Sequence, residues 1–411
     1  MPASRYETAL HWLIVALAFT IPMPVATNNL LLALLILAAP PLLGKKILHI
    51  TQHNLVAGVS VLLFGYLFFG TLWGHTPWGQ AMGILGKYMD LALIPVFMLL
   101  LRDPSVREHS LQAFFCIMSL VLALSWAVGM KLLPITPWVQ TLIGPSATAE
   151  NPSIFHSHIT QGLLTSFACF LFALRAGEVG ALRRRMLFAF LSLAAAANVL
   201  FLLQGRTGYA VLFTLLIWVI WNNLRRVLPH QSRHVLILSA LLLPLILLWA
   251  AYHGIPAFHD RTSLAVAEFS AWQPGQNHAN SSMGQRLDFY SNTARLIVQH
   301  PLMGYGTGGF AEAFARQTAQ MDVITTQNPH NEYLMLAAQV GLPGALLLML
   351  LFITQWRCAA RLPPFEQVAA RGLVLTYALT CLFNSMLLDH TEGLFFAFMT
   401  AWLFAPLSQR D

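Results

Sequence analysis

Charged residues are scarce in this chain. Asp, Glu, Lys and Arg together make up 9% of its 411 residues, whereas a soluble globular protein carries about 25%. Hydrophobic residues make up 57%, and the mean hydropathy is +0.64. This composition excludes a water-soluble globular domain. It indicates a polytopic membrane protein, because many apolar runs reach the spanning length of about 20 residues.

Cysteine is also rare, with four in the chain. Cys116, Cys169 and Cys381 lie within apolar runs, and Cys358 follows one, so no disulfide framework is expected in the long polar segment. The net charge of +7 does not indicate nucleic-acid binding, because Lys and Arg collect on the cytoplasmic loops of membrane proteins. The expected surroundings are membrane lipids, with no nucleic-acid partner.

The apolar runs predict an all-α polytopic membrane protein with about twelve transmembrane helices. Most Lys and Arg residues fall on one side of the membrane if both termini are cytoplasmic. We expect an N-terminal transmembrane bundle of about nine helices (1–252), a long outer loop with short helices (253–329) and about three C-terminal transmembrane helices (330–411). The runs lie near 9–22, 29–43, 54–73, 79–101, 109–132, 154–175, 186–204, 207–223, 234–252, 330–355, 369–388 and 393–407.

Several basic residues fall in the membrane or on its outer side, where the orientation bias does not explain them. Arg206 and Arg286 are candidates for binding a phosphate or pyrophosphate group, because guanidinium groups fork onto phosphate oxygens; the alternative is contact with lipid headgroups. Arg295 and Arg316 are expected to contact headgroups only, and Arg261 is left open. The full set is Lys87, Lys131, Arg206, Arg261, Arg286, Arg295 and Arg316.

Lys87 stands inside the fourth apolar run, with Asp90 one turn later. A charge at membrane depth costs several kcal/mol, so it usually faces a cavity or a partner. Lys87 therefore either contacts an anionic ligand or forms a neutralising pair with Asp90.

The outer loop ends at residues 328–332, where an apolar run begins. Asn328 is expected to be the N-cap and Pro329 the first helical residue, which places His330 in the first turn of a membrane helix. A neutral histidine facing a polar cavity there suits a general base; alternatively, His330 only anchors the helix. Asp389, in the last outer turn, either orients His330 or the acceptor, or caps the final helix.

Other motifs indicate structure rather than chemistry. His156 and His158 alternate at the outer face, but no nearby Asp, Glu or Cys completes a metal site, so hydrogen bonding to a glycan or within the fold is expected. Gly304–Gly309 matches G-x-G-x-x-G, yet no strand precedes it, so a glycine-rich turn between two short helices is expected. The outer segment has no Asp-x-Asp pattern for a divalent cation.

Three motifs resemble one family. His330-Asn331, nine residues and then Gly341-Leu342-Pro343-Gly344 resemble the H-[NSQ]-x9-G-x-x-G signature of bacterial O-antigen ligases, within the O-antigen ligase and polymerase superfamily. The segment from Gly284 to Gly308 resembles the outer-loop motif of the same superfamily. Arg206 stands where the family has R-x-x-x-L, although Ala210 occupies the leucine position.

The resemblance implies a GT-C-type glycosyltransferase of the bacterial inner membrane that uses no metal or other cofactor. Such ligases transfer a glycan, with inversion, from undecaprenyl pyrophosphate to a sugar hydroxyl of lipid A–core on the periplasmic face. The matched motifs give His330 as the base and Arg206 and Arg286 for the pyrophosphate. Lys87 is expected to join the arginines, and the candidates for supporting roles are Asp389, Asn331, Arg261, His156 and His158.

Other activities stay open beside the ligase. An O-antigen polymerase and a protein O-oligosaccharyltransferase resemble the same family, but the latter tends to carry extra C-terminal sequence, and the end of this chain at Asp411 favours the ligase. A transporter of lipid-linked glycan is the alternative from another class. Its intramembrane charges would lie in paired, broken helices, and only Lys87 and Asp90 hint at that.

Overall fold

A computed structural model of the chain describes residues 5–38, 40–203, 205–227, 233–274, 276, 278 and 280–409. These residues form helices joined by turns, and no strand occurs among them. The expected all-α class is therefore confirmed for the described part of the chain. Two compact units can be distinguished, and each is built from segments that are distant in sequence.

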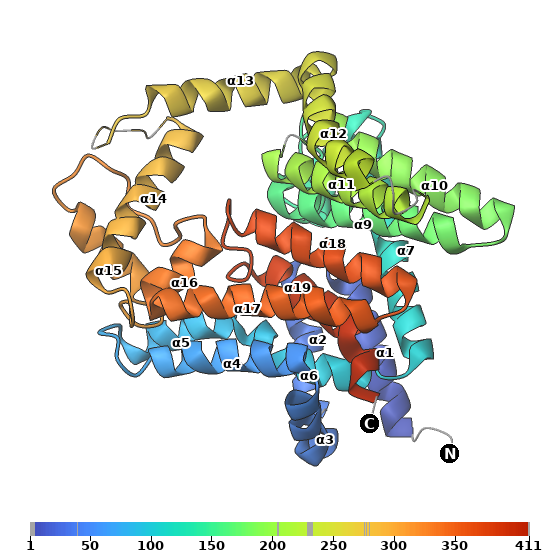
Figure 1. The fold of residues 1–411 in the computed structure, drawn as a ribbon, viewed down its shortest axis with the longest axis horizontal. Coiled ribbons are helices and arrows are strands. Elements are labelled where there is room, and N and C mark those ends of the chain that lie inside the picture. The colour runs from blue at the N-terminus through green and yellow to red at the C-terminus, as the bar shows by residue number, and fades with distance from the viewer. Residues whose placement is uncertain are drawn as a thin grey trace. The chain divides into compact units, whose positions relative to one another are not determined.

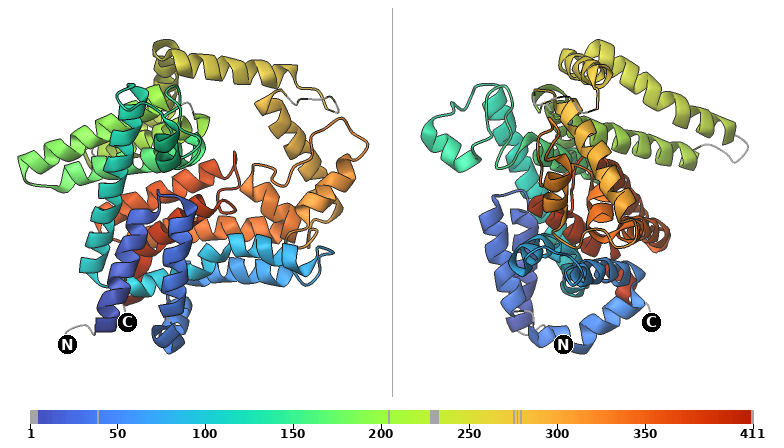
Figure 2. Two further views of the ribbon diagram at one scale, coloured as in Figure 1. Left: turned by 180° about the vertical axis from the view of Figure 1, so that it is seen from behind. Right: turned by 90° about the vertical axis from the view of Figure 1, so that its left-hand side faces the viewer.

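Unit 1 comprises Met1–Leu43, Leu100–Asp260 and Arg361–Thr376. Within it, α9 packs against α10 and α11, and α1 packs against α7 and α2; both views in Figure 2 show α1 and α2 side by side. A Cβ atom on Gly162 of α9 would lie 3.1 Å from the Cα of Gly208 in α11, so these helices cross where small residues allow close approach. The helices are α1 (Arg5–Thr20), α2 (Val25–Ala38), α7 (Pro104–Gly129), α8 (Pro137–Ile143), α9 (His158–Glu178), α10 (Leu182–Ala197), α11 (Arg206–Val227) and α12 (Arg233–Gly254), with a π-helical turn at Asn198–Leu202.

Unit 2 comprises Gly44–Leu99, Arg261–Ala360 and Tyr377–Asp411. Figure 1 shows α17, in orange, beside α4, in blue, and these helices pack together; α16 packs against α4, α14, α15 and α17. Its helices are α4 (Leu55–Gly70), α5 (Trp78–Lys87), α6 (Met89–Leu100), α14 (Ser282–Gln299), α15 (Phe310–Thr318), α16 (Glu332–Val340), α17 (Leu342–Cys358) and α19 (His390–Phe404). Four α-helices have residues in both units: α6, which belongs to unit 1 only by Leu100, α3 (Pro40–His53), α13 (Pro256–Ala271) and α18 (Pro364–Thr380).

Local sequence explains where several helices begin. Asp103 precedes α7 and accepts a hydrogen bond from the Ser105 amide at 2.8 Å, and Pro104 occupies the first helical position, where its missing N–H costs nothing. Asn54 caps α4 and also donates to the Phe404 carbonyl at 3.0 Å. Asn54 therefore ties the start of α4 to the end of α19 within unit 2.

Five of the described helices are long and apolar enough to cross a membrane, and up to seven spans result if each of two bent pairs counts as one. The bent pairs are Gly44–His53 with Leu55–Gly70, at 102°, and Trp78–Lys87 with Met89–Leu100, at 43°. The chain is thus a helical membrane protein. The expected count of about twelve spans and the division at residues 252 and 329 stay predictions. The five helices are Pro104–Gly129, His158–Glu178, Leu182–Leu202, Arg206–Arg225 and Leu342–Arg361.

Besides the run 79–101, which forms the bent pair α5 and α6, two predicted apolar runs near His330 do not form single helices. Gly341 divides the run 330–355 into α16 and α17, and its φ of +76° is one that L side chains rarely adopt. In the run 369–388, α18 ends at Thr380 and residues 381–389 form a series of turns. Apolar composition predicts burial, but it does not show where tertiary contacts replace the hydrogen bonds of a helix. These two breaks lie beside the candidate site.

Candidate functional site

His330 lies in a turn directly before α16. This helix begins at Glu332, and Asn331 is its N-cap, with a side-chain oxygen that accepts the Leu334 amide hydrogen at 3.0 Å. The expected N-cap at Asn328 and the helical position for Pro329 are therefore wrong. Asn328 instead accepts a hydrogen bond from the His330 amide at 2.8 Å. An Asn side chain that binds the backbone two residues on closes a tight turn, and this competing bond moves the helix start.

The backbone of His330 is left-handed, with φ of +54°. A residue other than glycine pays about 1–3 kcal/mol for such a conformation, which persists only when surrounding contacts enforce it. One contact is the bond from its amide to Asn328. Another comes from Tyr290 of α14, whose hydroxyl lies 3.0 Å from the His330 carbonyl and 2.8 Å from that of Leu382. The hydroxyl has one hydrogen, which these two carbonyls share. His330 is thereby held to α14 and to the 381–389 turn.

The imidazole of His330 has one defined hydrogen-bond partner. Its Nδ1 lies 2.9 Å from Oδ1 of Asn384, and Nδ2 of Asn384 donates to Oδ2 of Asp389 at 3.0 Å. A carboxylate only accepts hydrogen bonds, so Asp389 fixes the Asn384 amide with its oxygen towards the histidine. An oxygen there requires a hydrogen on Nδ1. The lone pair of the neutral ring is then on Nε2, the atom that can accept a proton from a substrate.

Asp389 lies at the end of this chain of hydrogen bonds, in the turn before α19. Burial raises the pKa of its carboxyl group, whereas His330, the hydrogen bond from Asn384 and the positive charge of Lys87 lower it. Lys87 itself is exposed while Asp90 is buried, and no ion pair joins the two in the described part of the chain. The expected neutralising Lys87–Asp90 pair is therefore not observed, and the charge of Lys87 acts on Asp389.

Two aromatic residues of α14 form one side of the site. Phe289 stacks on the His330 ring, with 6.1 Å between ring centroids and 27° between planes. Burial raises the pKa of the neighbouring Tyr290, and the positive charge of Arg286 lowers it. Arg286 precedes Tyr290 by four residues, so both lie on one face of the helix. The structure thus places Arg286 on the helix that carries both the ring stacked on His330 and the hydroxyl bound to its backbone.

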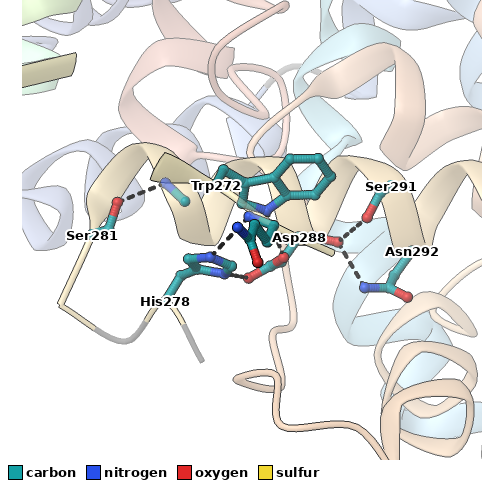
Figure 3. A network of polar contacts seen from close by, with 8 residues as sticks. Trp272, His278, Ser281, Asp288, Ser291 and Asn292 are labelled. Carbon is teal, nitrogen blue, oxygen red and sulfur yellow. Dashed lines mark hydrogen bonds and ion pairs between the residues drawn. The ribbon is translucent and has the colours of Figure 1, made fainter. Parts of the chain in front are cut away.

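A polar network fixes the beginning of α14 (Figure 3). The buried carboxylate of Asp288 accepts the indole N–H of Trp272 at 2.8 Å and lies 2.8 Å from Nδ1 of His278. Ser281 caps the helix by accepting the Gly284 amide hydrogen at 2.9 Å. The segment before α14 is thus tied to the turn of the helix that carries Arg286. None of these residues was singled out in the sequence, because a buried Asp cannot be told from a surface Asp by composition.

Glu332, the first residue of α16, connects this helix to the 381–389 turn. Its carboxyl group is fully buried and accepts hydrogen bonds from the Tyr88 hydroxyl and the Leu387 amide, each at 2.8 Å. The Glu332 amide in turn donates to the Cys381 carbonyl at 2.8 Å. Both ends of the 381–389 turn are therefore bound to the first residue of α16. This arrangement holds Asn384 opposite His330.

The remaining predicted site residues are Arg206, His156 and His158 in unit 1 and Arg261 at the start of a segment of unit 2. Arg206 is the first residue of α11 in unit 1, and its predicted turn includes Gln204, which lies outside the described residues. A Cβ atom on Gly205 would lie 3.1 Å from the His158 carbonyl, so His158 lies against the residue that precedes Arg206. His156 bonds through Nε2 to the Met23 carbonyl at 3.0 Å, which is a contact within the fold. Arg261 is exposed on α13.

Sequence reasoning missed Asn384, Tyr290 and Phe289 as site residues. Tyr290 lay within the segment that resembles the outer-loop motif, without a role of its own, and Asn384 lay within a predicted membrane helix. A polar Asn inside an apolar run was the available signal, because such residues in membranes usually have a partner. No group of three or more His, Cys, Asp or Glu placed to hold a metal ion occurs among the described residues.

Comparison with known proteins adds two similarities. Residues 163–349, which run from within α9 into α17 and include His330, match the family described as O-antigen ligase. A protein of Haemophilus influenzae described as uncharacterised is 30% identical over 83 residues, which cover 19% of this chain and 21% of that protein. The matched segment thus spans about a fifth of that relative's length, and its description carries no activity.

Proposed function

Because the chain belongs to the O-antigen ligase superfamily, we propose that it is an O-antigen ligase of the bacterial inner membrane. It transfers a glycan from undecaprenyl pyrophosphate to a sugar hydroxyl of lipid A–core, at the periplasmic face, without a metal ion. Both termini are cytoplasmic in this proposal, and the helices have the GT-C arrangement. The observation that carries it is the hydrogen-bond chain from His330 through Asn384 to Asp389.

The proposed reaction uses Nε2 of His330 as a general base. This atom accepts the proton of the acceptor hydroxyl while the hydroxyl oxygen attacks the anomeric carbon of the donor. The bond from that carbon to the pyrophosphate breaks on the opposite face, so the configuration inverts and undecaprenyl pyrophosphate leaves with the bonding electron pair. The imidazolium ion that forms is stabilised by Asn384, whose amide is polarised by Asp389. A positioned base of this kind contributes about 100- to 10,000-fold to a rate.

Negative charge grows on the leaving pyrophosphate as this bond breaks. Positive groups fixed in advance stabilise such charge, which is often the largest single contribution to catalysis. Arg286 is the best supported of these groups, because it shares a helix face with Tyr290 and its charge acts there. Lys87 is supported by its effect on Asp389. Arg206 rests on the resemblance to the family motif, whereas the supporting roles of Arg261, His156 and His158 rest only on their expected place on the outer side of the membrane.

A reconstituted transfer assay tests the proposal. Purified protein, undecaprenyl-pyrophosphate-linked glycan and lipid A–core are mixed in the presence of EDTA, and a ladder of glycan-bearing lipid A–core is followed on a gel. We expect a ladder with the wild type and at least a 100-fold loss with His330→Ala. His53→Ala is the matched control, because His53 is an exposed histidine of the same unit and lines neither the His330 site nor the cavity beside α15.

The alternatives predict different products in the same assay. Longer polyprenyl-linked glycans would indicate an O-antigen polymerase, and glycan on Ser or Thr of an added acceptor protein would indicate a protein O-oligosaccharyltransferase. Loss of activity on addition of EDTA would contradict the metal-independent reaction. Wild-type activity in His330→Ala, at equal expression and equal melting temperature, would contradict the base assignment.

A further inference from the structure

Unit 2 contains a cavity that the proposed reaction does not use. Its volume is about 690 Å³, within the range of about 300–1,000 Å³ that small-molecule sites occupy. Its wall is formed by the turn after α4, the last residues of α14, the glycine-rich turn 304–309 and one face of α15. The residues that the argument uses are Trp73, Thr76, Gln299, His300, Tyr305 and Gln317.

Aromatic rings in this wall are held in fixed orientations. The indole N–H of Trp73 donates to the Met303 carbonyl at 2.8 Å, and the Tyr305 hydroxyl donates to Oε1 of Gln299 at 2.6 Å. His300 meets the Tyr305 ring edge-on, with 4.7 Å between centroids. Rings that cannot turn away lose little conformational entropy when a ligand stacks on them. Such surfaces suit a flat, partly apolar ligand such as the C–H face of a pyranose ring.

The polar groups of the wall form one directed chain. From Gln299, whose oxygen accepts the Tyr305 hydroxyl, Nε2 donates to Oε1 of Gln317 at 3.3 Å, and Nε2 of Gln317 donates to the Asn292 carbonyl at 2.8 Å. Each amide retains a second N–H and a second lone pair. Thr76 adds a buried hydroxyl that has no hydrogen-bond partner in the described part of the protein. These groups can both donate and accept hydrogen bonds, as sugar hydroxyls require.

The charged and polar residues of the cavity wall are poorly suited to the two other parts of the donor, the pyrophosphate and the polyprenyl chain. Among the described residues of the wall, Arg316 is the one Lys or Arg, and its Nη1 lies 3.8 Å from Oε1 of Glu312 in the preceding turn of α15. A cation with its own carboxylate partner is a poor receptor for pyrophosphate, and a wall rich in amides and hydroxyls is a poor receptor for a polyprenyl chain. The chemistry therefore fits an uncharged, polyhydroxylated ligand.

The cavity and the catalytic site lie along one helix. Phe289 stacks on His330, whereas Leu296 lines the cavity. These residues are seven positions apart on α14, which is about 10 Å along the axis and nearly two full turns, so they lie on one stripe. A glycan that reacts at His330 can therefore reach the cavity with sugar units a short distance from the reacting one.

We infer that this cavity is a saccharide-binding subsite that holds sugar units remote from the transferred bond. The inference rests on the proposed function for the choice of ligand. Two saccharides share this chemistry: the glycan chain of the donor and the core oligosaccharide of the acceptor. Binding there stabilises the complex without touching the reacting atoms and uses distant sugars to orient them.

The test measures binding rather than transfer. Full-length protein in detergent is titrated by calorimetry with lipid-free O-polysaccharide fragments and, separately, with core oligosaccharide released from lipid A. We expect one of these probes to bind, and Trp73→Leu and Gln317→Leu each to raise its Kd by at least about tenfold, or ~1.4 kcal/mol. Trp78→Leu is the matched control, because Trp78 is exposed and does not line the cavity.

The outcomes separate the two saccharides and the two proposals. Binding of the O-polysaccharide fragments makes the cavity a donor subsite, and binding of the core oligosaccharide makes it an acceptor subsite. No binding of either probe, or binding unchanged by both variants, would overturn the inference. Gln317→Leu decides the result if Trp73→Leu lowers the melting temperature. A protein that binds sugar but transfers none would retain the subsite and lose only the proposed function.

Discussion

A single histidine held in an unfavourable backbone conformation is the most informative residue of this protein. His330 adopts φ of +54° because Asn328 and Tyr290 bind its amide and carbonyl groups. Its side chain is oriented separately by Asn384. Backbone and ring are therefore fixed by different partners, as a group that must meet a substrate in one geometry requires. The hydrogen-bond chain from His330 through Asn384 to Asp389 should therefore control the rate of transfer.

Replacing Asn384 with Leu should lower transfer by up to about 100-fold, because the ring loses the partner that fixes its tautomer and angle. Asp389→Asn keeps an acceptor for Asn384 but removes the charge, so its loss should be smaller than that of Asp389→Ala. Initial rates at saturating donor and acceptor measure all three variants, with melting temperature as the control for folding. Equal rates for Asn384→Leu and wild type would show that Asn384 does not position His330.

Among the elements, the glycine-rich turn between α14 and α15 joins several parts of unit 2. Thr307 donates from its amide to the Gly70 carbonyl at 3.0 Å, and Tyr305 from its amide to the Ala338 carbonyl at 2.9 Å. Gly306 makes this approach possible, since its φ is +83° and a Cβ atom there would overlap the backbone of Gly74. The turn therefore fastens α16, which follows His330, to the end of α4.

Gly306→Ala should destabilise the protein by about 1–3 kcal/mol from backbone strain alone, with a further cost from the overlap with Gly74. Gly79→Ala is the matched control, because a Cβ atom there meets nothing within 4 Å. Melting temperatures in one detergent compare the two variants. Similar melting temperatures for both would mean that the turn does not depend on close backbone contact.

On the scale of the whole molecule, the candidate residues are divided between two units. His330, Asn331, Asp389, Arg286 and Lys87 belong to unit 2, whereas Arg206, His156 and His158 belong to unit 1. The proposal that Arg206 and Arg286 bind one pyrophosphate is therefore a statement about the assembled protein. The test asks whether the effect of replacing Arg206 on the transfer rate changes when Arg286 is also replaced.

A double-mutant cycle on transfer rates measures that dependence. If both arginines bind the same pyrophosphate, Arg206→Ala and Arg286→Ala should be non-additive by about 0.5–3 kcal/mol. Lys at either position should restore only part of the rate, since it keeps the charge but not the forked geometry. Arg295→Ala is the control, because Arg295 is an exposed arginine of α14. Strict additivity would assign Arg206 to a different role.

The sequence by itself determined the membrane class, the helical fold of the described residues and the family, and it singled out His330 as the candidate histidine. These follow from composition, from the length of apolar runs and from three short motifs, all of which are local properties of the chain. The glycine-rich turn was also predictable, because no strand precedes it and glycine permits φ above zero.

Only the tertiary structure decided how the site is built. Asn328 was expected to cap a helix, but its bond to the His330 amide closes a turn, and Asn331 caps the helix instead. Asn384 was placed in a membrane helix, yet buried Glu332 binds the amide of Leu387 and holds that segment as a turn. Both differences have one physical cause. A polar side chain forms hydrogen bonds with groups that folding brings close to it, and the sequence alone does not show which groups those are.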